Sequence, residues 1–132
     1  MRWGWAYDEA RLDVMKTLFT EDAAFKVVSG AYTPGVDVVG VDKIIGINTG
    51  ALKFQGDQRR HVISNVIIEK LTESEATALA FCITTLAANG LSNGATVMYS
   101  ADLRRGADGV WRFSRFVIGI DDYAGRPPPP PM

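Results

Sequence analysis

The chain has 132 residues, of which 47% are hydrophobic and 22% charged, and its formal net charge is −1. This size and composition are typical of one soluble globular domain and leave no room for a second core. The near-neutral charge argues against nucleic acid or an anionic membrane surface as the main partner. No stretch approaches the roughly 18 apolar residues of a membrane-spanning helix.

Cysteine and histidine each occur once, as Cys82 and His61. A single cysteine cannot form an internal disulfide, which favours a reducing compartment and hence the cytoplasm. The N-terminal apolar run is short and is interrupted by Asp8, so it does not predict a secretory signal. Too few His and Cys ligands are present for the usual transition-metal sites. We therefore expect no metal. The Gly-rich stretches lack a phosphate-loop pattern, and we expect no organic cofactor either.

The first half of the chain predicts two helices with short strands between them. A helix is expected over 3–19, short strands over 23–29 and 36–39, and a second helix over 42–54. A Pro- and Gly-containing loop is expected between the two strands. One face of the first helix carries residues at steps of three and four: Trp5, Asp8, Leu12, Met15 and Phe19.

The second half of the chain predicts four long strands joined by turns. They cover 59–71, 75–88, 95–105 and 110–121, with a loop of turn-forming residues over 89–94. Helices followed by hairpin-connected strands indicate an α+β fold with a mostly antiparallel sheet. Such a sheet can curl around the helices and leave a central pocket, where small-molecule sites usually lie.

The C-terminal segment 123–132 contains the run Pro127–Pro131. Proline has no backbone N–H, and this run carries no core residues. We expect a disordered tail after a single domain over 1–122, with a docking peptide as the alternative.

His61 opens the first long predicted strand. Period-two alternation would place His61, Ile63, Asn65 and Ile67 on one face of that strand. Two polar groups on a mainly apolar face favour a lined cavity over a dry core. The alternative is a structural histidine that binds the backbone.

Asp8 interrupts the apolar stripe of the first helix, and Tyr7 precedes it. A carboxylate paired with histidine orients the ring and raises its basicity, and a tyrosine hydroxyl can polarise a carbonyl. Tyr7, Asp8 and His61 together suit proton abstraction next to a carbonyl, followed by elimination or isomerisation. The alternative is that Asp8 lies near a helix end and is partly solvated.

Three segments in order, 8–23, 60–69 and 99–115, resemble the SnoaL-like branch of the nuclear transport factor two-like superfamily. Their marks are Asp8 with Asp22-Ala23, then Arg60-His61-Val62, then Trp111-Arg112-Phe113. The resemblance extends over 2–122 and implies a cone-shaped roll. Relatives of this fold commonly associate, so it also implies a homo-oligomer, dimer or trimer.

Within that branch, the chain is most similar to members with an Asp-His pair: scytalone dehydratase, bile-acid 7α-dehydratase and hexachlorocyclohexane dehydrochlorinase. The resemblance implies His61 as general base, Asp8 as its orienting partner and Tyr7 as a hydrogen-bond donor. The second histidine of scytalone dehydratase would fall near Leu86, which departs from that pattern. The expected pocket lining is Trp3, Trp5, Phe25, Tyr32, Asn65 and Tyr99.

The sequence thus predicts a cofactor-independent lyase or isomerase, of dehydratase type, acting on a small apolar carbonyl or hydroxyl compound. Two alternatives stay open, because a fold does not determine a function. One is a non-catalytic small-molecule binding module, in which Asp8 and His61 only satisfy each other. The other is a polyketide-type cyclase that uses the same groups to form a carbon–carbon bond.

Overall fold

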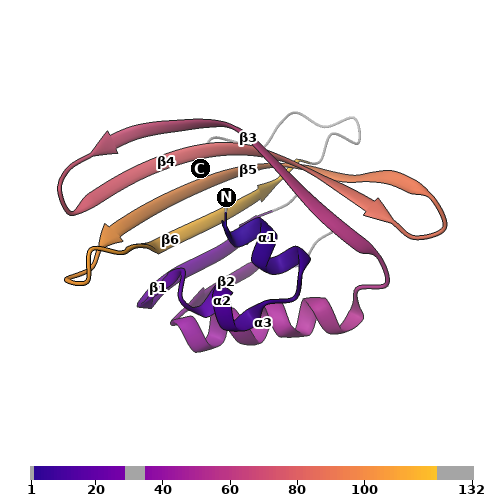
Figure 1. Ribbon diagram of the computed structural model, residues 1–132, viewed down its shortest axis with the longest axis horizontal. Coiled ribbons are helices and arrows are strands. Elements are labelled where there is room, and N and C mark those ends of the chain that lie inside the picture. The colour runs from indigo at the N-terminus through magenta and orange to yellow at the C-terminus, as the bar shows by residue number, and fades with distance from the viewer. Residues whose placement is uncertain (1, 29–34, 122–132) are drawn as a thin grey trace.

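A computed structural model describes residues 2–28 and 35–121 (Figure 1). The expected tail and the residues around Tyr32 lie outside this part. No helix within it is long and apolar enough to span a membrane. The elements are α1 (Arg2–Asp8), α2 (Leu12–Lys16), β1 (Phe19–Val28), β2 (Val36–Val39), α3 (Val41–Phe54), β3 (Gln58–Leu71), β4 (Glu75–Ala87), β5 (Leu91–Arg105) and β6 (Trp111–Ile120).

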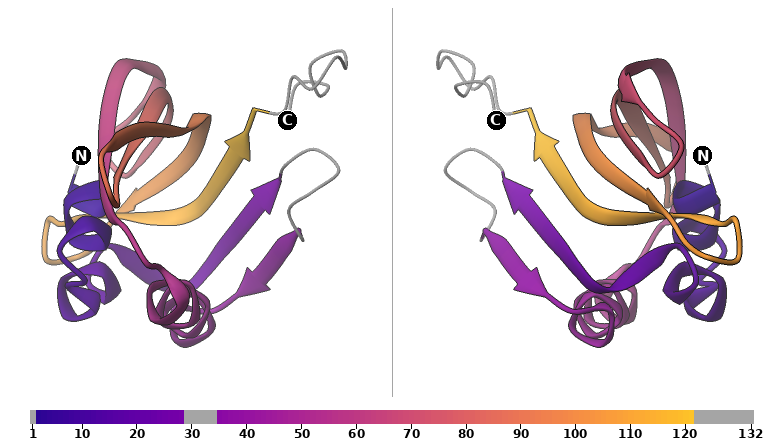
Figure 2. Two further views of the ribbon diagram at one scale, coloured as in Figure 1. Left: turned by 90° about the vertical axis from the view of Figure 1, so that its right-hand side faces the viewer. Right: turned by 90° about the vertical axis from the view of Figure 1, so that its left-hand side faces the viewer.

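The six strands form one sheet in the order β2-β1-β6-β5-β4-β3. All neighbouring pairs are antiparallel except β1 and β6, which are parallel. The sheet curls strongly, and all three helices lie on its concave side (Figure 2). The expected α+β fold with a curved, mostly antiparallel sheet is confirmed, as is the second helix.

The helix expected over 3–19 is instead two short helices, and Phe19 already belongs to β1. The break lies at Ala10, whose φ of 52° is outside the helical region. The Arg11 N–H closes this turn by donating to the Ala6 carbonyl at 2.7 Å. Periodicity continued across the break, so the apolar pattern alone did not reveal it. Asp8 consequently ends a helix.

Strand β5 begins at Leu91, four residues earlier than expected. Asn89 and Gly90 both have positive φ, 58° and 122°, and form the turn between β4 and β5. Asn-Gly is the strongest short hairpin signal, because its backbone twist fits that of the strands. The expected loop over 89–94 is therefore reduced to a tight turn.

A bulge in β3 reverses the expected alternation of its faces. Ser64 pairs with Phe81, but the next pairing is Ile67 with Leu79, so β3 has one extra residue there. Asn65 sits in this bulge with a φ of 53°. As a result Val66 and Ile68 take the concave side in place of Asn65 and Ile67. The prediction that Asn65 shares a face with His61 is wrong.

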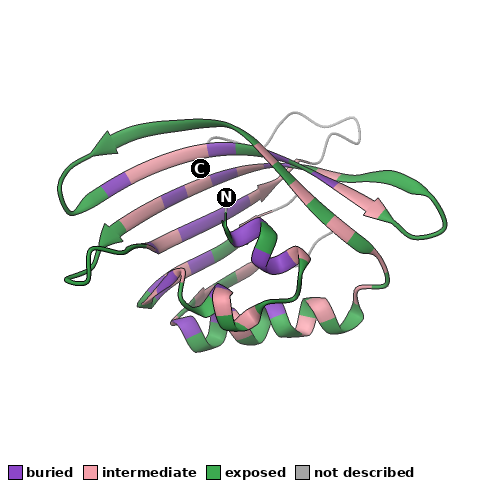
Figure 3. Ribbon diagram, viewed as in Figure 1, coloured by how far each residue is buried: buried purple, intermediate pink, exposed green. Residues whose placement is uncertain are grey.

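The core lies where α1 crosses the middle of the sheet (Figure 3). Figure 1 shows that the end of β3, the beginning of β4 and the end of β5 extend beyond this helix, on the left side of the view. Buried aromatic rings from both layers pack together, with centroids 4.7–6.3 Å apart. Their members are Trp3, Phe19, Phe25, Tyr99, Phe113 and Phe116.

Candidate functional site

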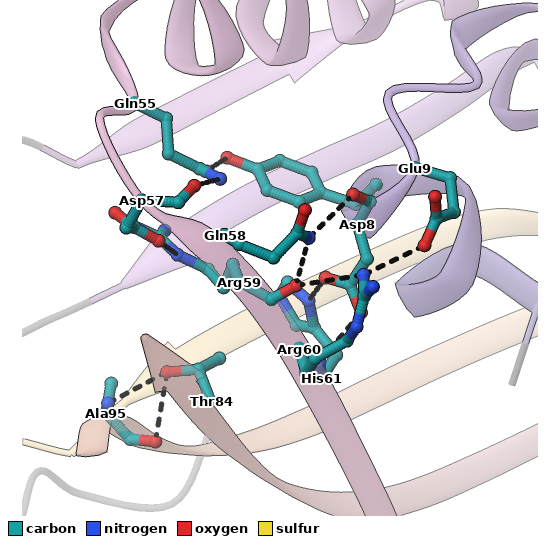
Figure 4. A network of polar contacts seen from close by, with 11 residues as sticks. Asp8, Glu9, Gln55, Asp57, Gln58, Arg59, Arg60, His61, Thr84 and Ala95 are labelled. Carbon is teal, nitrogen blue, oxygen red and sulfur yellow. Dashed lines mark hydrogen bonds and ion pairs between the residues drawn. The ribbon is translucent and has the colours of Figure 1, made fainter. Parts of the chain in front are cut away.

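Asp8 and His61 are brought together by α1 crossing the start of β3 (Figure 4). Asp8 Oδ1 lies 2.6 Å from His61 Nδ1, and Asp8 Oδ2 accepts the backbone N–H of His61 at 2.9 Å. The carboxylate therefore binds the same residue twice and fixes both its ring and its backbone. A carboxylate on Nδ1 favours the tautomer with hydrogen on Nδ1, which leaves a basic lone pair on Nε2.

Both members of this pair are nearly inaccessible, with side chains 7% exposed for His61 and 6% for Asp8. Burial lowers the pKa of His61 below its usual value, while the hydrogen bond and charge of Asp8 oppose this effect. From the sequence, Asp8 was predicted to raise the basicity of the ring. Burial outweighs that contribution here, so the imidazole is neutral at neutral pH.

Tyr7 lies beside His61, with ring centroids 5.2 Å apart and nearly perpendicular planes. Its hydroxyl donates to Gln55 Oε1 at 3.1 Å, across 48 positions of sequence. Burial raises the pKa of Tyr7, so its phenol stays protonated at neutral pH. The expected hydrogen-bond donor of the site is thus already bound to a protein acceptor.

Trp3 packs its indole against His61, with centroids 5.3 Å apart, and against Tyr99 at 5.7 Å. The residue is 3% exposed, and its Nε1 has no hydrogen-bond partner among the residues that the structure describes. A buried donor without a partner costs about 1–3 kcal/mol. An acceptor oxygen on a bound compound is one group that would satisfy it.

An apolar pocket of about 200 Å³ lies on the concave side, where the sheet extends beyond α1. Tyr99 belongs to its lining, whereas Asp8 and His61 do not. Trp3 contacts both Tyr99 and His61, so it links one wall of this pocket to the Asp-His pair. The lining residues are Val66, Ile68, Ala78, Leu79, Ala80, Tyr99, Ala101, Leu103 and Phe113.

The other expected lining residues occupy different environments. Phe25 is buried on β1 and contacts Phe116, with centroids 6.1 Å apart. Trp5 is 49% exposed and lies under the Arg11 guanidinium, so it does not join the buried cluster. Asn65 is exposed in the bulge, and Tyr32 falls outside the described residues. Among the predicted lining residues that the structure describes, Trp3, Phe25 and Tyr99 belong to the core.

Two residues of the site, Gly4 and Gln55, were not predicted from the sequence. Gly4 faces β3 so closely that a Cβ there would lie 2.9 Å from His61 Cβ. A glycine inside a predicted helix was a usable signal, because it weakens the helix and its presence therefore calls for a packing reason. Gln55 follows the end of α3, and no local pattern marked it. In the described part, no three His, Cys, Asp or Glu side chains form a metal-binding group.

Comparison with known proteins places this geometry in a family. Residues 1–117 match the family described as SnoaL-like domain. The chain belongs to this family. Its fold is that of the nuclear transport factor two-like superfamily, whose solved members include proteins described as having a cystatin-like fold. No protein with a curated description matches the chain.

Three solved structures illustrate the likeness. A nuclear transport factor two-like protein from Novosphingobium aromaticivorans is 18% identical, with 93% of this chain and 77% of that chain covered and a TM-score of 0.77. A Catenulispora acidiphila protein in complex with S-DNPA is 22% identical (90% and 85% covered, TM-score 0.76). ActVI-ORFA from Streptomyces coelicolor is 20% identical (91% and 90% covered, TM-score 0.75). At these identities the likeness establishes the fold alone.

Proposed function

We propose that this SnoaL-like protein is a cofactor-independent acid–base enzyme, a lyase or isomerase of dehydratase type. Its substrate would be a small, mostly apolar carbonyl or hydroxyl compound. The observation that carries the proposal is the buried contact of Asp8 Oδ1 with His61 Nδ1 at 2.6 Å, together with the bond from the His61 N–H. The members with an Asp-His pair are the relatives whose chemistry it would share.

In this mechanism His61 is the general base and Asp8 its orienting partner. His61 Nε2 takes a proton from the carbon next to a carbonyl, and the resulting imidazolium is stabilised by the Asp8 carboxylate. The proton then returns to a departing hydroxyl, releasing water, or to another carbon of the substrate. The neutral imidazole needs no prior deprotonation, because burial lowers the pKa of His61.

The surroundings of the pair support an apolar substrate with one acceptor oxygen. The nearby pocket is lined by apolar side chains, and the buried Trp3 Nε1 has no acceptor within 2–28 and 35–121. The complex of the Catenulispora acidiphila protein with S-DNPA supports ligand binding by this fold. The SnoaL-like family includes polyketide cyclases, so a cyclase is the second candidate, and product analysis separates it from a dehydratase.

The first test is an NMR titration of His61, whose ring is the only imidazole in the chain. We expect a pKa below about 6.5 in the parent and a lower one in Asp8→Asn, because Asp8 opposes the effect of burial. Asp13→Asn is the matched control, since Asp13 is exposed and pairs with Arg11. A His61 pKa that is the same in the parent and in Asp8→Asn would contradict the contact between Asp8 and His61.

The second part of the test is turnover of screened hydroxy-carbonyl compounds. His61→Ala and Asp8→Asn should each reduce kcat/KM by about 10²–10⁴-fold. In Asp8→Asn, the amide N–H donates to Nδ1 and favours the tautomer with hydrogen on Nε2. The loss of kcat/KM in this variant should therefore resemble the loss in His61→Ala. Activity should fall as the pH drops through the pKa of His61. Full turnover in both variants would exclude this mechanism, and binding without turnover would favour a binding module.

A further inference from the structure

Gln55 determines which way the Tyr7 hydroxyl points its hydrogen. The Gln55 amide lies between two partners: Nε2 donates to the Asp57 carbonyl at 3.0 Å, and Oε1 faces the Tyr7 hydroxyl at 3.1 Å (Figure 4). A carbonyl only accepts, so the amide nitrogen has to face Asp57. The amide oxygen then faces Tyr7 and also only accepts. Tyr7 must therefore donate its single hydrogen to Gln55.

The segment that holds Gln55 is itself anchored. The Asp57 carboxylate accepts two hydrogen bonds from Arg59, one from Nε at 3.2 Å and one from Nη2 at 3.1 Å. Two parallel bonds of this kind fix the planar groups relative to each other. The Asp57 and Arg59 side chains are only 16% and 31% exposed. The Gln55 amide is consequently held in one orientation by a rigid neighbour.

Because the Tyr7 hydroxyl donates its hydrogen to Gln55, only its oxygen lone pairs remain for a further hydrogen bond. The imidazole beside it is in the same condition, because Nδ1 donates to Asp8 and Nε2 carries a lone pair. Both groups therefore accept hydrogen bonds, and their rings lie 5.2 Å apart. A compound whose polar group reaches either of them has to supply a donor.

We infer that Gln55 is a positioning residue that turns Tyr7 into a hydrogen-bond acceptor, so that the site selects compounds carrying a hydroxyl group. This inference rests on the proposed function, because it names the substrate class of the same site. It narrows the carbonyl or hydroxyl class to compounds with a hydroxyl that binds Tyr7. It also reverses the donor role that the resemblance implied for Tyr7.

The test compares two probes, 2-naphthol and 2-methoxynaphthalene, which share a ring system but differ in the donor. Binding is measured by calorimetry, and the His61 ring signals show that the probe reaches the site. We expect the parent to prefer the naphthol by about 2- to 10-fold, the worth of one net hydrogen bond. Gln55→Leu frees the Tyr7 hydrogen to donate to the ether oxygen, so the preference should disappear or reverse.

Two further variants separate this effect from a loss of packing. Gln55→Glu keeps an acceptor for Tyr7 and should retain the parent preference. Gln58→Leu makes the same chemical change at an exposed glutamine that bonds backbone carbonyls, and it should also retain the preference. Because each comparison is a ratio of two probes, a general loss of affinity cancels.

The outcomes are distinct from those of the His61 titration, since probe binding requires neither turnover nor the Asp-His contact. A parent-like preference in Gln55→Leu overturns the inference. If that variant does not fold, Tyr7→Phe replaces it: the preference must disappear there, and its survival overturns the inference as well. Equal affinity of both probes for the parent, or no binding of either, has the same consequence.

Discussion

Gly4 is the residue that allows α1 to approach β3. A Cβ at this position would lie 2.9 Å from His61 Cβ, closer than packed side chains come, and 3.1 Å from Ile63 Cδ1, which is tighter than most Cβ contacts. Asp8 follows one turn later and needs this approach to reach both the ring and the backbone of His61. Glycine inside a helix costs about 0.5–1 kcal/mol relative to alanine, so packing explains its presence here.

We predict that Gly4→Ala lowers the free energy of unfolding by about 1–3 kcal/mol, because overpacking exceeds the gain in helix propensity. It should also shift the His61 pKa, since Asp8 moves with the helix. Gly46→Ala is the control: Gly46 lies inside α3 with nothing near its missing Cβ. That variant should be neutral or stabilised by up to about 1 kcal/mol in urea unfolding. Equal effects of the two would contradict the packing argument.

The bulge in β3 shapes the pocket at the scale of a single element. One extra residue at Asn65 moves Val66 and Ile68 to the concave side, where both line the apolar pocket. Without it, Ile67 would take that side and Ile68 would face outward. The positive φ of Asn65 is what the bulge requires, and asparagine tolerates that conformation better than most residues.

Substitutions at Asn65 should therefore follow backbone preference and not polarity. Asn65→Gly is expected to be neutral, whereas Asn65→Val should cost about 1–2 kcal/mol, because a β-branched residue resists positive φ. Ser64→Val is the control at the neighbouring exposed position of the strand and should stay within about 0.5 kcal/mol. Thermal or urea unfolding measures all three. An undisturbed Asn65→Val would mean that the bulge does not depend on this residue.

At the scale of the whole molecule, one face of the curled sheet carries exposed apolar side chains opposite the helices. Val62 of β3 pairs directly with Ile83 of β4, and Phe81 lies two residues before Ile83 on β4. They are 54%, 47% and 50% exposed. Contiguous exposed apolar groups of this kind often mark interaction surfaces.

We predict that the protein forms a homo-oligomer through this face. Phe81→Glu should dissociate it to monomers while leaving the fold intact, because a carboxylate is costly to bury without a partner. Phe54→Glu is the control, since Phe54 is 87% exposed at the end of α3. Light scattering coupled to gel filtration measures the mass. A monomeric parent at micromolar concentration, or an oligomeric Phe81→Glu, would contradict the prediction.

The sequence by itself predicted the order of helices and strands, apart from the division of the first helix into two, and it singled out Asp8 and His61 as candidate site residues. Those features depend on local signals: a repeat of two or 3.6, a turn dipeptide, or a polar residue on an apolar stripe. The break at Ala10 and the bulge at Asn65 escaped because each inserts one irregular residue into a pattern that continues on either side. Local periodicity therefore does not indicate where one extra residue shifts the pattern.

Only the tertiary structure decided what surrounds the Asp-His pair. Gln55 meets Tyr7 across 48 positions, and Gly4 meets His61 across two layers, so no local pattern contains either contact. The same holds for the charge state of His61. A carboxylate nearby predicts a more basic ring, but burial, which depends on the whole fold, opposes it and prevails. Periodicity in a sequence encodes which face a residue occupies, whereas contacts and dielectric surroundings arise only when distant faces pack.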